Sequence, residues 1–515
     1  MTNETRTKSS IKSMSMAATL QIAKQILEFG VRTVFIALLP IEYLGVNGLF
    51  TNILTCMSLA ELGVGSALVY SMYKPMAEGD HETLKTYMNA YKNIYRVIGI
   101  VVLSIGIILL PFLDFFVSGD TDIPNLRLIF ILYVLKNTAS YFFAYKQSAF
   151  SVDQKQYVIT MNNLIVEVAT AISRVIVLVV FRNFVAYLLV SIICIYLGNI
   201  RIAYLANKEY PYLKEKEYKK LDGDKRKGLV KNVSAMFLHK LSYVILGSTD
   251  NIILSKIFGL VIVGLYSNYQ ILLNVVKMVF DMVADSIVPS VGNFCASESK
   301  EKMYKLFNTV LYINIGAVSF CCIGLYCLST PFIRLWIGNN YVMDNSVIFM
   351  LVLSIYIQLT MRAIEIFRTA TGLFVRDKIY AVLQCVVNIV VSIIAAYRIG
   401  PAGIFIGTSV AMITTRFWSS AKYVYNEAFC VPVIRYYKKY LFLTAVAGIC
   451  FLCTCWIGKM VVSDGNGIGA FAAMLIITLI VPNGIFVACT FWTDEFKDCL
   501  KRIQPILNHV KRKSR

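Results

Sequence analysis

The stretch QIAKQILEFGVRTVFIALLP, residues 21–40, combines the two features that decide the fold. It lies in an apolar run of membrane-spanning length, and yet it contains Lys24, Glu28 and Arg32. A single charge in contact with hydrocarbon costs about 2.5–3.5 kcal/mol. Counting from Gln21, polar residues recur at i+4, i+7 and i+11, which places them on one helical face. The stretch therefore predicts a membrane helix with one face toward lipid and the other toward polar groups.

The composition extends this interpretation to the whole chain. Of the 515 residues, 57% are hydrophobic and only 16% are charged, against about 25% charged residues in soluble domains. The mean hydropathy is +0.65. These values predict an all-α polytopic membrane protein with no separate soluble domain.

Apolar runs long enough to cross a bilayer recur about fourteen times along the chain. We predict spans over residues 13–39, 44–71, 93–118, 124–150, 156–181, 184–206, 229–256, 260–290, 303–329, 341–371, 376–397, 402–425, 438–458 and 467–491.

Lysine and arginine are distributed unevenly between the two ends of these spans. One end of the spans carries little beyond Arg127, Arg182, Lys256, Arg334, Arg398 and Lys459. The other carries most of the basic residues, including Arg6, Lys8, Lys12, Lys74, Lys85, Lys146, Lys155, Lys300, Lys302, Lys305, Arg376, Lys378, Arg435, Lys438, Lys439 and the tail residues 511–513. Basic residues are retained in the cytoplasm, so we expect a plasma or inner cell membrane protein with both termini cytoplasmic. The same rule explains the net charge of +20 without a nucleic-acid partner.

The order of the spans predicts two lobes of about six helices each, followed by two more helices. Residues 48–52, GLFTN, and residues 264–268, GLYSN, open two spans that are six spans apart. An even number of intervening spans gives parallel repeats. The predicted parts are an N-lobe over 1–206, a cytoplasmic linker over 207–228, a C-lobe over 229–425, two extra spans over 426–491 and a basic cytoplasmic tail over 492–515.

Charged residues within the spans predict a hydrated cavity between the helices. The cavity cations expected to attract an anionic substrate are Lys24, Arg32, Lys136, Arg174, Lys240, Lys277 and Arg362. The carboxylates that are candidates for coupling to H⁺ or Na⁺ are Glu28, Glu61, Glu167, Asp250, Asp281 and Glu365. The alternative for each pair, such as Lys24 with Glu28 at i, i+4, is mutual neutralisation that only stabilises the fold.

Several motifs resemble those of bacterial polysaccharide flippases of the Wzx type. The second-span signature is matched by YLGVNGLF at 43–50, SLAELGVG at 58–65 and YKP at 73–75. Further similarity lies in YPY at 210–212, LHK at 238–240, STDN at 248–251, VGLYSNY at 263–269 and GIFIGT at 403–408.

The resemblance implies the fold of the multidrug/oligosaccharidyl-lipid/polysaccharide exporters, in which two lobes open alternately to each side. It also implies transport of an oligosaccharide linked to undecaprenyl pyrophosphate from the cytoplasmic to the outer leaflet. The expected partners are this lipid-linked oligosaccharide, bilayer lipid, a polysaccharide polymerase and glycosyltransferases. The alternatives are a small-molecule antiporter of the multidrug type and a lipid II flippase, whose fourteen spans include an extra pair that forms a groove for the lipid tail.

An enzyme acting on the same lipid is the third alternative, and the sequence disfavours it. Such enzymes usually carry a large outer loop with basic catalytic residues, whereas the longest outer loop predicted here runs only over about 117–125. No phosphate-binding P-loop motif is present, which argues against direct use of ATP. The three histidines are scattered, so no metal site is expected, and no cofactor is expected either.

Overall fold

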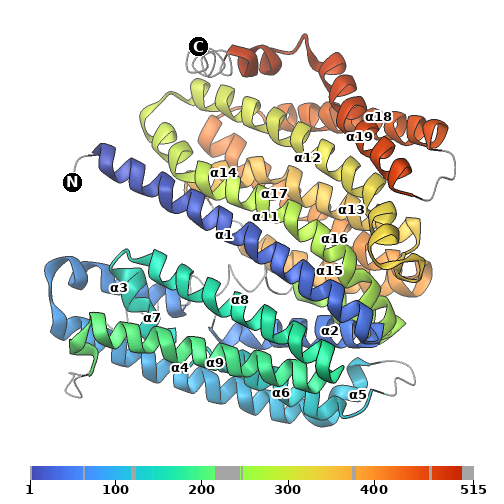
Figure 1. Cartoon of the computed structure of the whole chain (residues 1–515). Helices are drawn as coiled ribbons and strands as arrows, with labels where there is room; N and C mark the ends of the chain where they lie inside the picture. Colours follow the sequence, from blue (N-terminus) through green and yellow to red (C-terminus); the bar gives the residue numbers. More distant parts are fainter. Residues whose placement is uncertain are drawn as a thin grey trace, which may run out of the picture. The chain divides into compact units, whose positions relative to one another are not determined.

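A computed structural model of the chain describes residues 3–61, 64–117, 123–142, 144–214, 244, 247–373, 378–462 and 467–501. These residues form helices joined by short turns (Figure 1). The chain divides into two compact units, Met1–Gly264 and Leu265–Arg515.

The described residues between 3 and 214 of the first unit form nine α-helices and three short 3₁₀ turns. They are α1 (Asn3–Leu38), α2 (Ile41–Met57), η1 (Ser58–Glu61), α3 (Val64–Glu78), α4 (His81–Leu109), η2 (Leu110–Phe112), α5 (Leu113–Phe116), α6 (Leu126–Thr138), α7 (Ala144–Val152), α8 (Gln156–Phe181), α9 (Phe184–Glu209) and η3 (Pro211–Lys214). Residues 247–258 are also helical. Helix α11 (Leu260–Ser297) begins in this unit and continues into the second.

The second unit continues with a further set of long helices, two of which are broken near their middle. They are α12 (Lys300–Ile337), η4 (Asn339–Tyr341), α13 (Asn345–Thr360), α14 (Arg362–Ala370), α15 (Lys378–Ile399), α16 (Ala402–Thr414), α17 (Arg416–Tyr423), the π-helical turn η6 (Val424–Phe429), α18 (Ile434–Val461) and α19 (Ile468–Thr490). A last helix is described over residues 494–501.

Eight helices of the described residues are long and apolar enough to cross a membrane, from His81–Phe116 to Ile468–Thr490. The chain is therefore a multi-pass membrane protein, and the predicted all-helical class is confirmed. The number of fourteen spans stays a prediction. The predicted span over 229–256 lies mostly outside the described residues, and the one over 44–71 is divided among α2, η1 and α3.

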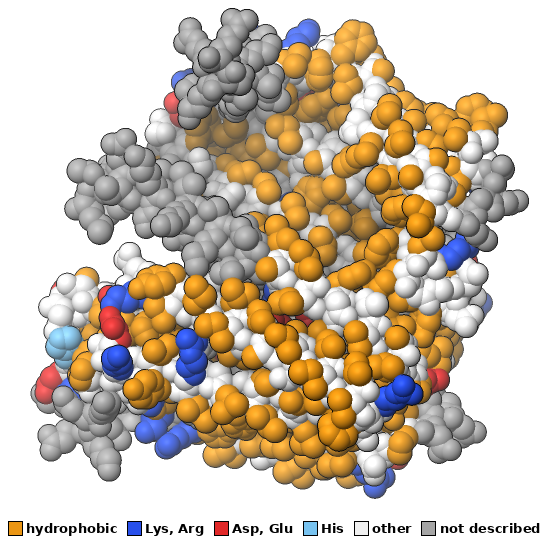
Figure 2. Space-filling model, in the orientation of Figure 1, with side chains coloured by type: hydrophobic (Ala, Val, Ile, Leu, Met, Phe, Trp, Pro, Cys, Tyr) orange, Lys and Arg blue, Asp and Glu red, His pale blue; other side chains and the backbone are white. Residues whose placement is uncertain are grey.

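Hydrophobic side chains cover most of the visible surface of the helices (Figure 2). Ile107, Phe181 and Trp456 each expose more than 60% of their surface, although they lie within long helices. Exposed apolar side chains of this size are unusual on a water-soluble domain. They form the lipid-facing surface that the sequence predicts.

Polar caps fix where several helices begin. The side chain of Asp80 accepts a hydrogen bond from the Thr83 amide at 2.9 Å, just before α4. Asn183 accepts one from Ala186 at 3.0 Å before α9, and Asp344 accepts one from Ser346 at 2.8 Å before α13. Each cap satisfies a backbone N–H that lacks a helical partner, so short turns suffice between the long helices.

Helix ends predicted to lie on the same side of the membrane meet in the first unit. Asp153 accepts hydrogen bonds from Lys155 at 2.9 Å and from the hydroxyl of Tyr210 at 2.7 Å, and Lys155 also reaches Glu209 at 2.5 Å. Burial alone would raise the pKa of the Asp153 carboxyl, but these hydrogen bonds outweigh it and hold this pKa below its ordinary value. The same bonds hold the pKa of Lys155 above its ordinary value. We refer to Asp153, Lys155, Glu209 and Tyr210 as the end cluster.

Gly45 of the YLGVNGLF motif and Gly264 of the VGLYSNY motif meet where α2 and α11 begin. A Cβ atom at Gly264 would lie 2.7 Å from the carbonyl oxygen of Ile41, and one at Gly45 would collide with the Leu260 backbone. Only glycine permits this approach, so the start of α11 is held against the start of α2 within the first unit.

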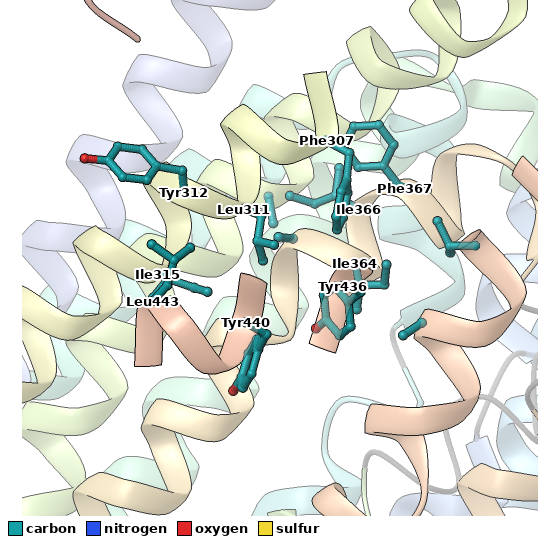
Figure 3. Packing of buried hydrophobic residues seen from close by; sticks show 14 of the residues in the cluster. Phe307, Leu311, Tyr312, Ile315, Ile364, Ile366, Phe367, Tyr436, Tyr440 and Leu443 are labelled. Atoms are coloured by element: carbon teal, nitrogen blue, oxygen red, sulfur yellow. The ribbon is translucent and has the colours of Figure 1, made fainter. Parts of the chain in front are cut away.

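The core of the second unit is aromatic. Phe307 and Leu311 of α12, Phe367 of α14 and Tyr436 of α18 are almost completely buried and pack together (Figure 3). The rings of Phe307 and Phe367 meet edge to face, with their centroids 5.2 Å apart. This packing fixes α14 against α12 and α18, next to the charged residues described below.

Candidate functional site

A charged cluster joins α1 and α8 in the first unit. Lys24 Nζ lies 3.5 Å from Glu167 Oε2, and Arg174 donates a hydrogen bond of 3.1 Å to Glu28. Glu28 and Glu167 also interact electrostatically with each other. The partners lie on different helices, so the pairing of Lys24 with Glu28 at i, i+4 is not the contact that forms.

Arg174 is the most buried member of this cluster. Its side chain exposes only 10%, and its Nε donates to the Ser191 hydroxyl of α9 at 2.8 Å. Its guanidinium lies 5.2 Å from the centre of the Tyr187 ring, a cation–π distance. These contacts hold the guanidinium in one place while Glu28 remains 43% exposed.

Lys136 and Arg32 complete the group, which we call the first-unit cluster: Lys24, Glu28, Arg32, Lys136, Glu167 and Arg174. Lys136 Nζ is 5.6 Å from the ring centre of Tyr133, and it interacts electrostatically with both carboxylates. Arg32 interacts with Glu28, Tyr187 and Tyr133. Four basic and two acidic residues leave two positive charges in excess, so the cluster can attract an anion.

A second cluster lies in the second unit, at the breaks in two helices. Arg362 is ion-paired with Asp281 of α11 and donates a 2.8 Å hydrogen bond to Glu365. Arg416 lies 3.4 Å from the other oxygen of Glu365. Arg368 interacts electrostatically with Glu365 and donates to the Ser420 hydroxyl at 3.1 Å. We call Asp281, Arg362, Glu365, Arg368 and Arg416 the second-unit cluster.

Hydrogen bonds from a neighbouring helix satisfy the backbone at one of the two helix breaks that carry this cluster. Arg362 and Arg416 each begin a half-helix, after the breaks at Met361 and Thr415. The Asn314 amide of α12 donates to the carbonyls of Leu359 and Thr360 at 3.0 and 3.2 Å. Broken helices in a membrane need such partners for the carbonyls that they release. These hydrogen bonds hold the break in one conformation, and we refer to such a break as a fixed joint.

Glu61 lies among tyrosines of the first unit and is not a member of the first-unit cluster. Its carboxylate accepts a hydrogen bond of 2.7 Å from Tyr95, and it interacts with Tyr91 and Tyr141 as well. Residue Gly65 leaves the room for these rings, since a Cβ there would lie 2.9 Å from the Tyr91 hydroxyl. An interhelical hydrogen bond, which is the simpler role for Glu61, is therefore present.

The remaining predicted residues are placed as follows. Asp250 lies in the helix over 247–258 of the first unit, next to the buried Asn251, and Ser255 of this helix donates a 2.8 Å hydrogen bond to the Phe116 carbonyl. Lys277 lies on α11, one turn before Asp281, and is half-buried. Lys240 lies outside the described residues.

Sequence reasoning missed four side chains that complete the two clusters. Arg416 and Arg368 neutralise Glu365, and Tyr187 and Ser191 orient Arg174. An arginine at 416, inside a predicted span, was a visible signal of the same kind as Arg362. Nothing in the sequence marks Tyr187 and Ser191, because their role arises from the packing of α8 against α9.

An apolar cavity of about 180 Å³ lies between α12, α13 and α18. Ile323, Tyr326, Leu353 and Phe451 are among its lining residues, and its polar contributions come from Ser319, Tyr356 and Thr444. A cavity lined in this way suits a hydrocarbon chain and not a charged group.

Comparison with known proteins identifies the family. The family model for polysaccharide biosynthesis proteins matches residues 10–294, more than half of the chain. The chain belongs to the polysaccharide biosynthesis protein family. The matched region includes every member of the first-unit cluster. No curated protein sequence matches the chain significantly.

Solved structures show that this family member has the fold of known membrane transporters. The lipid II flippase MurJ, in an inward closed conformation, matches with a TM-score of 0.65 at 14% identity, over 92% of this chain and 98% of that one. An inward-facing MATE family multidrug resistance transporter matches with a TM-score of 0.59 at 14% identity, over 76% and 93%. The Vibrio cholerae MATE transporter VcmN gives 0.52 at 14%, over 81% and 99%. The predicted resemblance is confirmed for the polysaccharide biosynthesis family and for a fold like that of MurJ and the MATE transporters.

Proposed function

We propose that this protein is a flippase that moves an undecaprenyl-pyrophosphate-linked oligosaccharide from the cytoplasmic to the outer leaflet by alternating access. The observation that carries the proposal is the first-unit cluster, because it places an excess of positive charge on membrane helices of a polysaccharide biosynthesis protein. A pyrophosphate is a compact anion that arginine and lysine bind well. The transporter-type fold supports movement of a substrate over chemical conversion.

In this proposal Lys24, Arg32, Lys136 and Arg174 attract the pyrophosphate. Arg174 is held by Ser191 and Tyr187, so it offers a prepositioned guanidinium at little further entropic cost. Lys24 is 47% exposed and can turn from Glu167 toward an incoming anion. Lys240 and Lys277 were predicted to act with them and remain candidates.

The polyprenyl tail is too apolar for such a cluster and has to remain in hydrocarbon. We propose that the cavity between α12, α13 and α18 takes part of it, since Tyr326 and Phe451 give it an apolar lining. Helix α18 belongs to the two extra spans predicted after the C-lobe. Replacing Leu353 with Trp fills this cavity, and we expect it to reduce transport of the full-length lipid more than that of a short-chain analogue.

For coupling, we propose that Glu28 and Glu167 bind a proton between them. Two carboxylates that interact with each other disfavour double ionisation, and the nearby cations affect when a proton leaves. Asp281 and Glu365 are held by arginines, which suits them less to a cycle of binding and release. Glu61 and Asp250 remain candidates. If this proposal is right, Glu167→Gln should alter the pH dependence of transport and Asp250→Asn should leave it unchanged. The opposite result would assign the coupling to Asp250.

The function is tested by reconstitution into vesicles that carry a radiolabelled undecaprenyl-pyrophosphate oligosaccharide. A glycosidase added outside reports the fraction of sugar that has reached the outer leaflet. We expect protein-dependent exposure of the sugar and a large loss with Lys24→Ala. Lys74→Ala, which removes an 83% exposed lysine from a surface pair with Glu78, is the matched control. Equal exposure with and without protein would reject the proposal.

A lipid II flippase is the second candidate, since the MurJ fold covers more of this chain than the MATE fold does. The same vesicles loaded with lipid II distinguish the two. Transport of the oligosaccharide lipid and not of lipid II supports our proposal, and the reverse result supports the second candidate. Transport of a cationic drug instead would favour a multidrug antiporter.

A further inference from the structure

The second unit contains a basic pocket that neither charged cluster includes. It has a volume of about 310 Å³ and is lined by Phe294 at the end of α11, Lys302 and Lys305 at the start of α12, and Asp498 and Lys501 of the last described helix. Three ammonium groups therefore surround a space of molecular size. The sequence predicts that this end of α11 and α12 is cytoplasmic.

The acidic residues around the pocket only partly neutralise it. Lys305 lies 3.2 Å from Asp498, and Lys302 lies 2.7 Å from Glu298. Three lysines and two carboxylates leave one positive charge. Lys302 and Lys305 expose about two thirds of their side chains, 65% and 67%. Their partners Glu298 and Asp498 are less exposed, at 34% and 13%, so the lysines are the accessible members of the two pairs and their ammonium groups can turn toward an anion in the pocket.

The helix that closes the pocket is anchored on one side and open to lipid on the other. Cys499 is buried in the core, Phe496 packs against it, and Glu495 is ion-paired with Lys439 of α18. Leu500 is 48% exposed on the same helix as Lys501, and Trp492, just before the helix, is 54% exposed. Tryptophan next to lysine is typical of the level at which lipid headgroups lie.

We infer that this pocket binds the phosphodiester headgroup of an anionic phospholipid from the cytoplasmic leaflet. A phosphodiester carries one negative charge, which matches the single excess positive charge of the pocket. The exposed apolar side chains beside it provide contacts for the acyl chains, which a free phosphate ion or a nucleic acid would leave unused. Bound lipid would clamp the last helix to the start of α12. This inference does not depend on which substrate the protein transports.

The experiment measures binding of a fluorescent short-chain phosphatidylglycerol to the purified full-length protein in neutral detergent. Phosphatidylcholine with the same chains and label is the probe for non-specific binding. We expect saturable binding of phosphatidylglycerol only. Each lysine removed should weaken it about fivefold. Lys302→Ala/Lys501→Ala leaves the Lys305–Asp498 pair in place and keeps the helix anchored.

Lys74→Ala/Lys422→Ala is the matched control, because it removes two exposed lysines that do not line the pocket. Asp498→Asn gives a test of opposite sign and should tighten binding, since it removes a negative charge from the lining. Excess inorganic phosphate separates the two sources of the anion. If phosphate competes as well as unlabelled phosphatidylglycerol, the site binds free anions and the lipid assignment is wrong. Equal affinity of the pocket variant and the control variant would also overturn it.

Discussion

In the first-unit cluster Lys24 and Glu28 expose 47% and 43% of their side chains, whereas in the second-unit cluster Arg362 and Glu365 expose 23% and 17%. The first cluster is spread over α1, α6 and α8 and has two cations more than carboxylates, whereas the second has one more. In the second, Asp281 faces Arg362, and Glu365 faces three arginines at the breaks of two helices. Similar residue types therefore form an accessible group that can attract an anion in the first unit and a fixed joint between half-helices in the second.

The difference shows that a charge inside a membrane helix is not by itself evidence of a binding site. A buried pair whose partners are all present contributes little net stability, but removal of one partner is costly. An exposed pair behaves in the opposite way, since its loss hardly affects folding and its charge remains available to a ligand. Separate measurements of stability and transport can therefore distinguish the two clusters.

The largest effect is expected for Arg362→Ala. This change leaves Asp281 and Glu365 with less compensation in a half-buried site, and such a loss typically costs about 3–5 kcal/mol. We expect a marked fall in the thermal unfolding temperature of the purified protein and in its yield. Arg362→Gln combined with Asp281→Asn should restore much of the stability, because both charges then disappear together. An unfolding temperature unchanged by Arg362→Ala would show that the second-unit cluster is not a structural joint.

The second prediction concerns Lys24→Ala in the first unit. We expect its free energy of unfolding to change by less than about 1 kcal/mol, because the pair with Glu167 is exposed. Transport of the lipid-linked oligosaccharide should fall by about 10- to 100-fold if the ammonium makes a charged hydrogen bond to the pyrophosphate, worth about 1.5–3 kcal/mol. If Lys24→Ala impaired folding as well as transport, the proposed difference between the two clusters would be wrong.

Much of this difference between the two clusters could not be predicted from the sequence. The apolar runs and the polar stripes predicted the helical membrane class and named most of the charged residues, since each of these signals is local along one helix. The partners are not local. Lys24 pairs with Glu167 and not with Glu28, and Arg362 pairs with Asp281 across 81 positions. Such contacts depend on which helices pack together, which periodicity does not encode.

The third prediction tests whether the break before Arg362 is a fixed joint. Asn314→Leu removes the donor to the carbonyls of Leu359 and Thr360. An unsatisfied polar group in an apolar environment costs about 1–3 kcal/mol, so we expect a fall in the unfolding temperature. Asn483→Leu is the control, since Asn483 is exposed and bonds only to the Leu479 carbonyl of its own helix. Equal effects of the two changes would argue against the joint.

The smallest effect concerns the end cluster of the first unit, which lies outside the predicted spans. Asp153 and Lys155 are about one third exposed. They therefore serve as a reference for how much a solvent-accessible ion pair contributes to stability. The pKa of Asp153 is held below its ordinary value by Lys155 and Tyr210 in spite of burial. Its contribution is therefore present above the unfolded-state pKa and is lost as the pH falls through the folded-state pKa.

We expect Asp153→Asn to lower the free energy of unfolding by about 0.2–1 kcal/mol at pH 7. The difference from the unaltered protein should shrink as the pH is lowered below about 4, because the aspartate of the unaltered protein then becomes protonated. Thermal unfolding of both proteins between pH 7 and pH 3 measures this difference in stability. The other carboxylates titrate in both proteins, so their contribution cancels when the two curves are subtracted. Asp114→Asn, which removes a carboxylate 3.7 Å from Arg127 that is 77% exposed, should show a smaller difference. If Asp153→Asn lowered the free energy of unfolding as much as Arg362→Ala does, the exposure of a charged pair would not determine how much it contributes to stability.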